Sequence, residues 1–365
     1  MENMVNLYNF KNTYNGKKIL ITGNTGFKGS WLSVWLKELG AVVYGYSIDV
    51  PIGDSMFKVL NLEKKFDTYF NDINDYDTLL ETIDNIKPDF IFHLAAQAIV
   101  INSYLEPVKT FETNVLGTVK LLEVLRVLNL KTNVIVITSD KCYENNEEQW
   151  SYRESDKLGG KDPYSASKGA AEIVFHSFYN SFFSQTNSNV KVTSARAGNV
   201  IGGGDWSDFR LVPDIINNLI ANTQLEIRNP NATRPWQHVL EPLCGYLLLG
   251  QNLSESNNIN GHSFNFGPIS EETFSVLDLY NEFINLWNED QIKINYLVKN
   301  NNYHEASFLK LSCDKANILL RWKPILNFKK TCNYTIYWYK TFLNKNEDIY
   351  TFTVNQIISF CNENK

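Results

Sequence analysis

Short apolar runs alternate with longer amphipathic stretches along the first 200 residues of the chain. The runs KKILITG, AVVYGYSID, DFIFHLAAQ and NVIVITSD have the length and the β-branched or aromatic content of buried strands. Between them, apolar residues recur at helical spacing, as Trp31, Trp35 and Leu39 do after the first run. Strands that alternate with helices predict a parallel, doubly wound α/β sheet, whose ligands bind at the carboxyl ends of the strands.

A glycine-rich turn joins the first predicted strand to the first predicted helix. Gly23, Gly26 and Gly29 give the spacing GxxGxxG. Glycines at these positions let the backbone approach a pyrophosphate, whose negative charge is favoured at a helix N-terminus. For the glycines alone, the alternative is an ordinary tight turn. Since strand, glycines, helix and a second strand follow in register, the pattern favours a dinucleotide-binding Rossmann fold.

Two acidic residues bear on which dinucleotide binds. The second predicted strand ends in Asp49, whose carboxylate can bond both hydroxyls of an adenosine ribose and would repel a 2'-phosphate. Since no arginine follows Asp49 closely, the sequence favours NAD over NADP. Asp72 precedes a further predicted helix, and we interpret it either as the N-cap of that helix or as an adenine contact.

The alternation loosens near residue 200, beyond which elements are shorter and Asn-rich loops are more frequent. We therefore predict a loosely held N-terminal tail at residues 1–16, an NAD-binding Rossmann domain at 17–200, and a smaller C-terminal α/β domain at 201–365 that mainly binds the substrate. The helix GAAEIVFHSFYNSFF is apolar nearly all round and is predicted to be buried.

Composition narrows the class of protein. The 365 residues, of which 44% are hydrophobic, suffice for a large core, and the formal charge of -6 argues against general nucleic-acid binding. The five cysteines are odd in number, widely spaced and without a CxxC pair, so we predict neither a disulfide frame nor a metal site. Neither an export signal nor a run of membrane-helix length is visible. We expect a cytoplasmic protein without membrane partners.

Arginines are concentrated in one part of the chain. Only 7 arginines accompany 27 lysines, and four of the seven fall between residues 196 and 234: Arg196, Arg210, Arg228 and Arg234. A local preference for arginine indicates planar, bidentate contacts to phosphate or carboxylate, and the alternative is structural salt bridges. The second domain is therefore predicted to bind a phosphorylated substrate.

The candidate catalytic residues lie at one strand end and one helix start. The run VITSDK ends in Ser139, Asp140 and Lys141. In DPYSASK, Asp162 can cap a helix, Pro163 suits its first turn, and Tyr164 and Lys168 lie four residues apart on one face. In a Tyr-Lys pair the ammonium is expected to lower the phenol pKa, so that the tyrosinate accepts a proton from a substrate alcohol while a nicotinamide accepts the hydride.

Together these motifs resemble the extended short-chain dehydrogenase/reductase family over nearly the whole chain. Six blocks, in order, more narrowly resemble the CDP-glucose 4,6-dehydratases: TGNTGFKGSWL, FHLAAQ, TSDKCYEN, GGKDPYSASKG, ARAGNVIGGGDW and RPWQHVLEPL. The resemblance implies tightly held NAD, CDP-D-glucose as substrate, CDP-4-dehydro-6-deoxy-D-glucose as product, and a place in 3,6-dideoxysugar and O-antigen synthesis. It also implies a homodimer through the helices near residues 110–128 and 163–183.

The resemblance also implies roles in the reaction. Tyr164 would take the 4-hydroxyl proton, with Ser139 bonded to the same oxygen and Lys168 holding the nicotinamide ribose. Asp140 would protonate the departing 6-hydroxyl if burial keeps it protonated. The dTDP-glucose relatives carry a glutamate as C5 base where Lys141 stands. Lys141 is then either a neutral base or a cation that stabilises the enolate, and a surface lysine is the remaining alternative.

Three other functions stay open on the sequence alone. A nucleotide-sugar 4-epimerase would share the cofactor, Tyr164 and Lys168, but would not need the acid and lysine at positions 140 and 141. A dehydratase of another NDP-sugar and a non-catalytic NAD-binding homologue are the further alternatives.

The predicted binding sites draw on most of these motifs. The cofactor site is expected to contain Gly23, Thr25, Gly26, Phe27, Lys28, Gly29, Asp49, Asp72, Ile73, Leu94, Ala95, Ala96, Asn114, Thr138, Tyr164 and Lys168. The substrate site is expected to contain Gln97, Ser139, Asn199, Arg210, Arg234, His304 and Glu305. His93 and His238 stand beside apolar residues and are interpreted as satisfied core histidines.

Overall fold

The computed structural model describes residues 10, 12–227, 229–268, 273–287, 296–298, 308–345 and 347–363. The predicted substrate residues His304 and Glu305, and Arg228 of the arginine-rich segment, lie outside the described residues.

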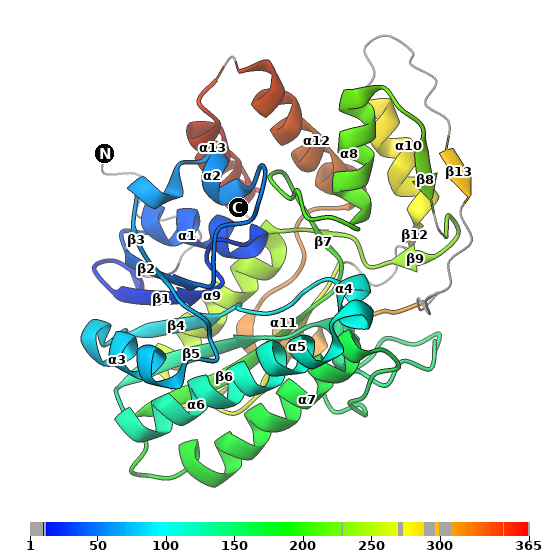
Figure 1. The fold of residues 1–365 in the computed structure, drawn as a ribbon. Helices are drawn as coiled ribbons and strands as arrows, with labels where there is room; N and C mark the ends of the chain where they lie inside the picture. The colour runs from blue at the N-terminus through cyan, green and yellow to red at the C-terminus, as the bar shows by residue number, and fades with distance from the viewer. Residues whose placement is uncertain are drawn as a thin grey trace.

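A seven-stranded parallel sheet forms the centre of the protein, in the order β11-β6-β5-β4-β1-β2-β3 (Figure 1). Its strands are β1 (Lys18–Thr22), β2 (Val42–Ser47), β3 (Asp67–Phe70), β4 (Phe90–His93), β5 (Thr132–Ile137), β6 (Val190–Ala197) and β11 (Ser263–Phe266). The chain runs outward from β1 to β3 on one side and from β4 to β11 on the other. The predicted doubly wound sheet is therefore confirmed, and its strand order reverses between β1 and β4, where such sheets bind ligands.

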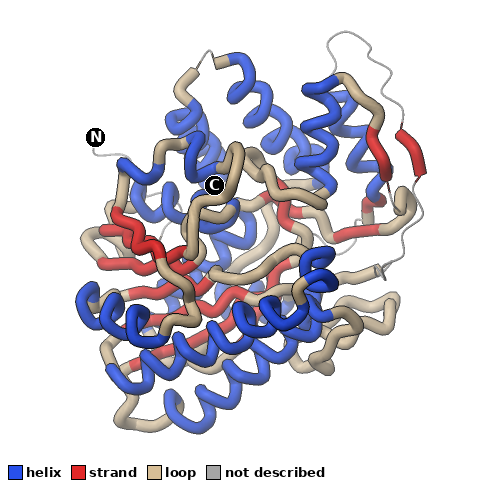
Figure 2. Tube along the Cα trace, viewed as in Figure 1, coloured by secondary structure: helices blue, strands red, loops and turns tan. Residues whose placement is uncertain are grey.

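Helices cover both faces of this sheet (Figure 2). One face packs on α3 (Tyr76–Ile86), α6 (Gly117–Leu128) and α7 (Pro163–Phe178), and the other on α1 (Phe27–Glu38), α9 (Leu240–Glu255) and α13 (Ile349–Asn362). Strand β1 shows why both faces are apolar, because Ile19 and Ile21 belong to one core cluster and Leu20 to the other.

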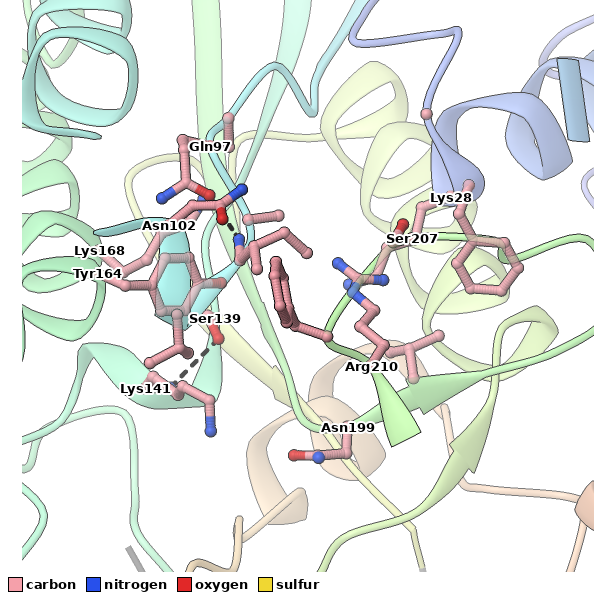
Figure 3. A pocket seen from close by; sticks show the side chains of 18 of the residues that line it. Lys28, Gln97, Asn102, Ser139, Lys141, Tyr164, Lys168, Asn199, Ser207 and Arg210 are labelled. Carbon is pink, nitrogen blue, oxygen red and sulfur yellow. Dashed lines mark hydrogen bonds between the residues drawn. The ribbon is translucent and has the colours of Figure 1, made fainter. Parts of the chain in front are cut away.

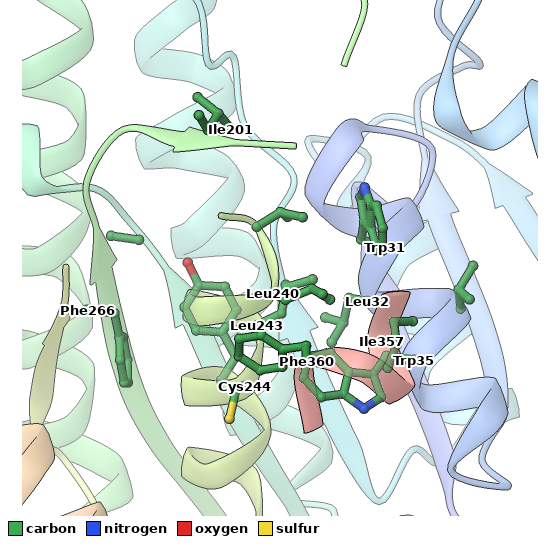
Figure 4. Close-up of a cluster of buried hydrophobic side chains, with 14 of the residues drawn as sticks. Trp31, Leu32, Trp35, Ile201, Leu240, Leu243, Cys244, Phe266, Ile357 and Phe360 are labelled. Carbon is green, nitrogen blue, oxygen red and sulfur yellow. The ribbon is translucent and has the colours of Figure 1, made fainter. Parts of the chain in front are cut away.

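The cluster under α1 joins distant parts of the chain (Figure 4). Trp31 and Trp35 are fully buried, and the ring of Trp35 meets that of Phe360 on α13 edge to face at 5.9 Å. Leu240 and Leu243 of α9 belong to the same cluster. The helix that begins at the glycine turn is thus held by the last helix of the chain.

The remaining elements form the upper part of Figure 1 and the connections to it. The upper part contains the helices α8 (Leu211–Ala221), α10 (Val276–Trp287) and α12 (Phe328–Asn344). Three two-stranded sheets accompany them: β7 (Val200–Ile201) with β10 (Gln237–His238), β9 (Thr233–Arg234) with β12 (Phe274–Ser275), and β8 (Leu225–Ile227) with β13 (Tyr296–Val298). Shorter helices are α2 (Met56–Val59), η1 (Leu62–Lys64), α4 (Val100–Leu105), α5 (Pro107–Phe111), η2 (Glu112–Leu116), η3 (Asp140–Cys142), η4 (Tyr179–Phe183) and α11 (Asp314–Leu320).

Two sequence elements from beyond residue 200 return to the central sheet. Helix α9 packs on β5 and β6, and β11 pairs with β6. The domain boundary near residue 200, and the substrate-binding role of the second domain, stay predictions. Residues 201–365 contribute both to the upper part of the molecule and to the central sheet.

The structure corrects two expectations about burial. The described residues of the N-terminal segment are not loosely held, because Phe10 and Tyr14 are buried and the Tyr14 hydroxyl donates a hydrogen bond to the Leu247 carbonyl at 2.5 Å. The helix predicted to be buried all round has an exposed apolar face, since Ile173 on α7 is 59% exposed and Phe182 in η4 is 41% exposed.

Candidate active site

A cavity of about 900 Å³ opens at the carboxyl ends of the central strands (Figure 3). Its lining runs from the glycine turn after β1, past the ends of β4 and β5, to Arg234 on β9. This volume lies in the upper part of the roughly 300–1,000 Å³ range of ligand pockets. The cavity contains every predicted site residue within the described part of the chain except Asn114.

Asn114 supports the cavity wall from behind. Its side chain is buried, accepts a hydrogen bond from the Gln97 amide at 2.8 Å and donates to the Ser167 hydroxyl at 2.8 Å. The amide group of Asn114 ties the loop after β4 to helix α7, and its contact with the cofactor stays a prediction.

The glycine turn has the geometry of a diphosphate cradle. Gly23 has a φ of +74°, and a Cβ on Gly29 would lie 2.1 Å from the Gly23 carbonyl oxygen. No side chain caps the N-terminus of α1, which begins directly after Gly26. Backbone amides at this helix start therefore face the cavity without a side-chain acceptor, and they suit a phosphate group.

The rim of this cradle is held by side-chain contacts between β1 and β2. The Thr25 hydroxyl donates to the Asp49 carbonyl at 2.8 Å, and the Thr25 amide donates to the Ser47 hydroxyl at 3.3 Å. The Asp49 side chain is exposed at the cavity edge. These contacts place an acceptor for ribose hydroxyls beside the diphosphate cradle.

Asp72 is not a helix cap. Helix α3 begins at Tyr76, and its N-cap is Asp75, whose carboxylate accepts from the Thr78 amide at 3.2 Å. Asp72 accepts from the Asn74 amide at 2.8 Å and lines the cavity. The N-cap interpretation is therefore wrong, and the adenine contact stays a prediction.

The end of β5 folds back to present a short polar turn. Ser139 is the N-cap of η3, and its hydroxyl accepts from the Lys141 amide at 3.3 Å and donates to Asp140 Oδ1 at 2.9 Å. Asp140 is only 2% exposed, and its Oδ2 has no hydrogen-bond partner among the described residues. An orphaned carboxylate oxygen in a cavity wall is available to a substrate hydroxyl.

Helix α7 brings Tyr164 and Lys168 to the same wall, as its start signals predict. The Asp162 carboxylate caps the helix by accepting from the Ser165 amide at 3.0 Å, and Pro163 is its first residue. Figure 3 shows Ser139, Lys141 and the Tyr164 ring on one side of the cavity, with Arg210 and Lys28 on the other.

The pKa of Tyr164 is raised, whereas the Tyr-Lys spacing predicted a lowered one. Burial raises the pKa of Tyr164 to about 12, while the hydrogen bond with Ser139 and the positive charge of Arg210 lower it. Burial also lowers the pKa of Lys168, to about 8. Arg210, from the opposite wall, is a cation that favours the tyrosinate.

Lys28, Lys168 and Arg210 line this cavity and repel one another. Burial lowers the pKa of Lys28 to about 7, and the charges of Arg210 and Lys168 lower it further, against Asp140 and Asp205. Arg210 Nη1 donates to the Asp205 carboxylate at 3.0 Å. A bound anion between these cations would relieve their mutual repulsion, which favours a phosphorylated ligand.

The arginines between residues 196 and 234 do not all have the same role: some line the cavity, and one forms a structural salt bridge. Arg210 and Arg234 line the cavity. Arg196 is fully buried and forms an ion pair with Glu172 at 2.7 Å, so for this residue the structural salt bridge is correct.

The two histidines interpreted as core residues, His93 and His238, differ in their hydrogen bonding. His93 is buried with Nδ1 2.7 Å from the Thr22 hydroxyl and Nε2 3.2 Å from the Thr118 hydroxyl, so it is satisfied as predicted. His238 is fully buried, but its Nε2 has no partner among the described residues. Burial lowers the pKa of both rings to about 3, so neither carries a charge near neutral pH.

Two residues near the site carried no signal in the sequence. Asp205 pairs with Arg210, although nothing in its glycine-rich loop indicates a salt bridge. Tyr246 on α9 is fully buried, and its hydroxyl has no hydrogen-bond partner within the described part of the chain. Burial raises its pKa, and the charges of Tyr164 and Asp140 add to this effect. Among 19 tyrosines, spacing could not single it out.

Within the described part of the chain, neither a metal-binding cluster nor a membrane-spanning helix is present. No cluster of three or more His, Cys, Asp or Glu side chains there could hold a metal ion. None of the helices described is both long and apolar enough to cross a bilayer.

Comparisons with known proteins agree with this architecture. Residues 20–335 match the family model described as GDP-mannose 4,6 dehydratase. A CDP-glucose 4,6-dehydratase of Salmonella typhimurium is 45% identical over 343 residues, which cover 93% of this chain and 94% of the relative.

Solved structures share the fold. The epimerase Mth375 of Methanothermobacter thermautotrophicus has a TM-score of 0.78 at 22% identity and covers 94% of this chain and 98% of its own. DesIV, a dTDP-glucose 4,6-dehydratase of Streptomyces venezuelae with NAD and TYD bound, has a TM-score of 0.76 at 21% identity and covers 91% and 99%. On the family match and the 45% identity, the chain belongs to the nucleotide-sugar 4,6-dehydratases of the extended short-chain dehydrogenase/reductase family.

Proposed function

We propose that the chain dehydrates CDP-D-glucose to CDP-4-dehydro-6-deoxy-D-glucose and water. The observation that carries the proposal is the convergence of the Ser139–Asp140–Lys141 turn and the Tyr164–Lys168 pair on one cavity beside the glycine turn. The 45% identity to a CDP-glucose 4,6-dehydratase supports CDP-glucose as the nucleotide sugar. The product lies on a route to 3,6-dideoxysugars of the O-antigen.

NAD, when bound here, supplies the hydride acceptor for the first step and the hydride donor for the last. The amides at the start of α1 bind its diphosphate, and the Asp49 carboxylate bonds the adenosine ribose. Asp72 and Ile73, which line the cavity, would hold the adenine, and Lys168 would hold the nicotinamide ribose. The uncapped helix start and the close approach required at the glycines support this assignment.

Alanine substitution of two glycines should separate binding from folding. A Cβ on Gly26 would meet only the Gly23 carbonyl oxygen, at 3.4 Å, so Gly26→Ala is expected to fold and to weaken NAD binding by about tenfold or more, since its methyl group fills the cradle. Gly29→Ala would place its Cβ 2.1 Å from that oxygen and is expected to lower the melting temperature. Calorimetric titration with NAD and thermal unfolding check both, and an unchanged affinity in Gly26→Ala would argue against the cradle.

Proton transfer begins at the sugar 4-hydroxyl. Tyr164 takes its proton as the C4–H bond is broken, and the Ser139 hydroxyl bonds the same oxygen. Burial opposes the tyrosinate, and the charge of Arg210 favours it. The result is a ketone at C4, which makes the neighbouring C5 proton acidic.

Loss of water uses the polar turn after β5. A base removes the C5 proton, and Asp140 gives its proton to the departing 6-hydroxyl, so that one water molecule leaves across C5 and C6. Lys141, which lines the same wall, acts as that base or stabilises the enolate as a cation. Hydride then returns to C6, and C5 is reprotonated, so the turnover consumes no external oxidant or reductant.

Polar groups elsewhere in the cavity bind the rest of the substrate. Arg210 and Arg234 bind the diphosphate, and Asn199 and Gln97 contact the sugar end. The pairing of Arg210 with Asp205 at 3.0 Å fixes the direction of its guanidinium and supports this role.

The proposal is tested with CDP-glucose carrying deuterium at C4, incubated with the purified protein without added NAD and followed by mass spectrometry. A product lighter by one water, with the label at C6, is expected. Label at C6 of a different nucleotide sugar, with CDP-glucose unchanged, would keep the reaction and overturn the substrate. Inversion at C4 without water loss would favour the epimerase alternative.

A homodimer is part of the same proposal. Large apolar side chains are exposed along α5, η2, α6, α7 and η4, among them Val108 at 69%, Leu116 at 47% and Ile173 at 59%. These helices are the ones expected to pair, and covering their apolar faces with a second copy would remove them from water. A monomer in sedimentation equilibrium at micromolar concentration would overturn it.

We also place the enzyme in the cytoplasm. All five cysteines are free thiols and four of them are buried, which suits a reducing compartment. Cell fractionation with activity measurement tests this placement.

A further inference from the structure

A buried carboxylate lies directly behind the catalytic wall. Glu172 of α7 is fully buried and accepts hydrogen bonds from Thr138 at the end of β5, from Ser194 of β6 at 2.9 Å and from Ser263 of β11 at 3.0 Å. Arg196 of β6 adds a charged donor at 2.7 Å. One side chain therefore joins the catalytic helix to three neighbouring strands.

The network continues through Arg196 to the cavity. Its guanidinium donates to the Tyr143 hydroxyl at 2.8 Å and to the Glu154 carbonyl at 3.1 Å, and it lies 5.0 Å from the centre of the Tyr143 ring. Tyr143 in turn donates to Asn265 of β11 at 2.7 Å and lines the cavity. The buried ion pair thus has direct contact with a residue of the cavity wall.

Stability alone is a weak reason for such a pair. Moving two charges out of water has a free-energy cost, and apolar side chains of similar volume often serve a core as well or better. Burial disfavours the charged form of Glu172, but Arg196 and the hydroxyl donors lower its pKa below the ordinary value, so the carboxylate is ionised. Glu172 thus places a charge at a buried position that an uncharged side chain of similar volume could fill.

The position of Glu172 suggests what the charge does. Thr138, which donates to it, immediately precedes Ser139, and Glu172 follows Lys168 by one helical turn on the same face of α7. The hydrogen bond between Thr138 and Glu172 therefore fixes the two groups that must meet the substrate oxygen, the hydroxyl of Ser139 and the phenol of Tyr164, relative to each other.

Electrostatics point the same way. Burial lowers the pKa of Lys168 to about 8, and Glu172 is the main charge that raises it. The other titratable groups near Lys168 or Glu172 are Tyr164 and His176 on α7 itself and, from neighbouring elements, Lys28, His93, Cys142, Arg196 and Lys315. Of these, only Cys142 also favours the Lys168 ammonium, and burial raises the pKa of that thiol so that it stays protonated.

We infer that Glu172 is a positioning residue, which holds the Ser139 turn against the Tyr164–Lys168 helix and keeps the Lys168 ammonium charged in the working pH range. The inference rests on the proposed function in that Lys168 must be charged to hold the nicotinamide ribose. A purely structural Glu172 would affect folding but not the pH dependence of the reaction.

The test compares the pH profiles of kcat and of NAD affinity in Glu172→Gln and the double variant Glu172→Gln/Arg196→Met. The Lys168 ammonium is present below its pKa and is lost as pH rises through it, about 8 in the wild type. Without Glu172 that pKa falls, so the alkaline limb of both profiles is expected at lower pH. On the alkaline side, activity and affinity then fall about tenfold for each unit of displacement.

The double variant separates position from stability. Glu172→Gln leaves Arg196 as an unpaired buried cation and is expected to melt at a lower temperature, whereas the double variant removes both charges and should recover much of this loss. The alkaline limb is expected to stay displaced in both. A limb that returns to the wild-type position together with the melting temperature would overturn the inference.

A matched control and a second readout complete the design. Glu241 on α9 is also buried and accepts backbone hydrogen bonds, from Ile325 at 2.8 Å and Leu326 at 2.6 Å, so Glu241→Gln should leave the alkaline limb where it is. Calorimetric NAD titration needs no turnover. If the wild type fails to dehydrate CDP-glucose, the proposed function falls, while a displaced affinity profile in Glu172→Gln still supports the positioning role.

Discussion

Tyr164→Phe is expected to lower kcat for CDP-glucose by about 10³-fold, since the phenol is the group that removes the 4-hydroxyl proton. The substitution deletes one oxygen atom from a side chain that is only 7% exposed, so the cavity keeps its shape. Binding of NAD and of the nucleotide sugar should therefore change little. Steady-state kinetics with calorimetric titration of both ligands would measure the difference.

The chain contains its own control for this substitution. Tyr14 and Lys18 have the same spacing as Tyr164 and Lys168, and Tyr14 is also buried. Its hydroxyl bonds the Leu247 carbonyl, so Tyr14→Phe should lower the free energy of unfolding by about 1 kcal/mol and leave kcat unchanged. Similar activity in both variants would refute the role of Tyr164.

Asp140→Asn is expected to stop the loss of water while earlier steps continue. An amide cannot give up a proton to the departing 6-hydroxyl, and we expect a fall in product formation of about 10³-fold. Exchange of the C5 proton with solvent deuterium precedes water loss, so it should persist in this variant. Mass spectrometry of the recovered CDP-glucose in heavy water measures that exchange, and its loss would place Asp140 earlier in the reaction.

Lys141 belongs to the same experiment. Lys141→Met removes both a base and a cation, and it should abolish C5 exchange together with product formation. Lys141→Arg keeps the charge but cannot act as a base near neutral pH. Recovery of exchange in Lys141→Arg would assign the cation role, and continued absence would assign the base role. Exchange at the wild-type rate in Lys141→Met would show that Lys141 has neither role.

Local signals predicted the parts of the site that depend on neighbouring residues. The start of α7 follows from Asp162, Pro163 and the four-residue spacing of Tyr164 and Lys168, all within seven positions. The glycine turn is equally local. Such patterns fix backbone geometry over one or two turns, so the sequence alone predicts where α7 begins and that Tyr164 and Lys168 share one of its faces.

Contacts between distant residues were not predictable in the same way. Arg196 finds Glu172 24 positions away, and Tyr14 bonds a carbonyl 233 positions away. Asp72 and Asp75 are both plausible caps by residue type, and only the helix start at Tyr76 decides between them. The pKa of Tyr164 likewise depends on burial and on Arg210 across the cavity, which spacing does not report.

The packing of α13 on α1 has a consequence for synthesis on the ribosome. Phe360, which contacts Trp35 on the helix of the glycine turn, lies 325 positions after it in the sequence. Domains usually fold as they emerge, N-terminal part first. Here the nascent first half would wait, with an apolar helix face uncovered, until α13 has emerged from the ribosome, and chaperone contacts with α1 should persist until then. Ribosome profiling of chaperone-bound nascent chains would test this timing.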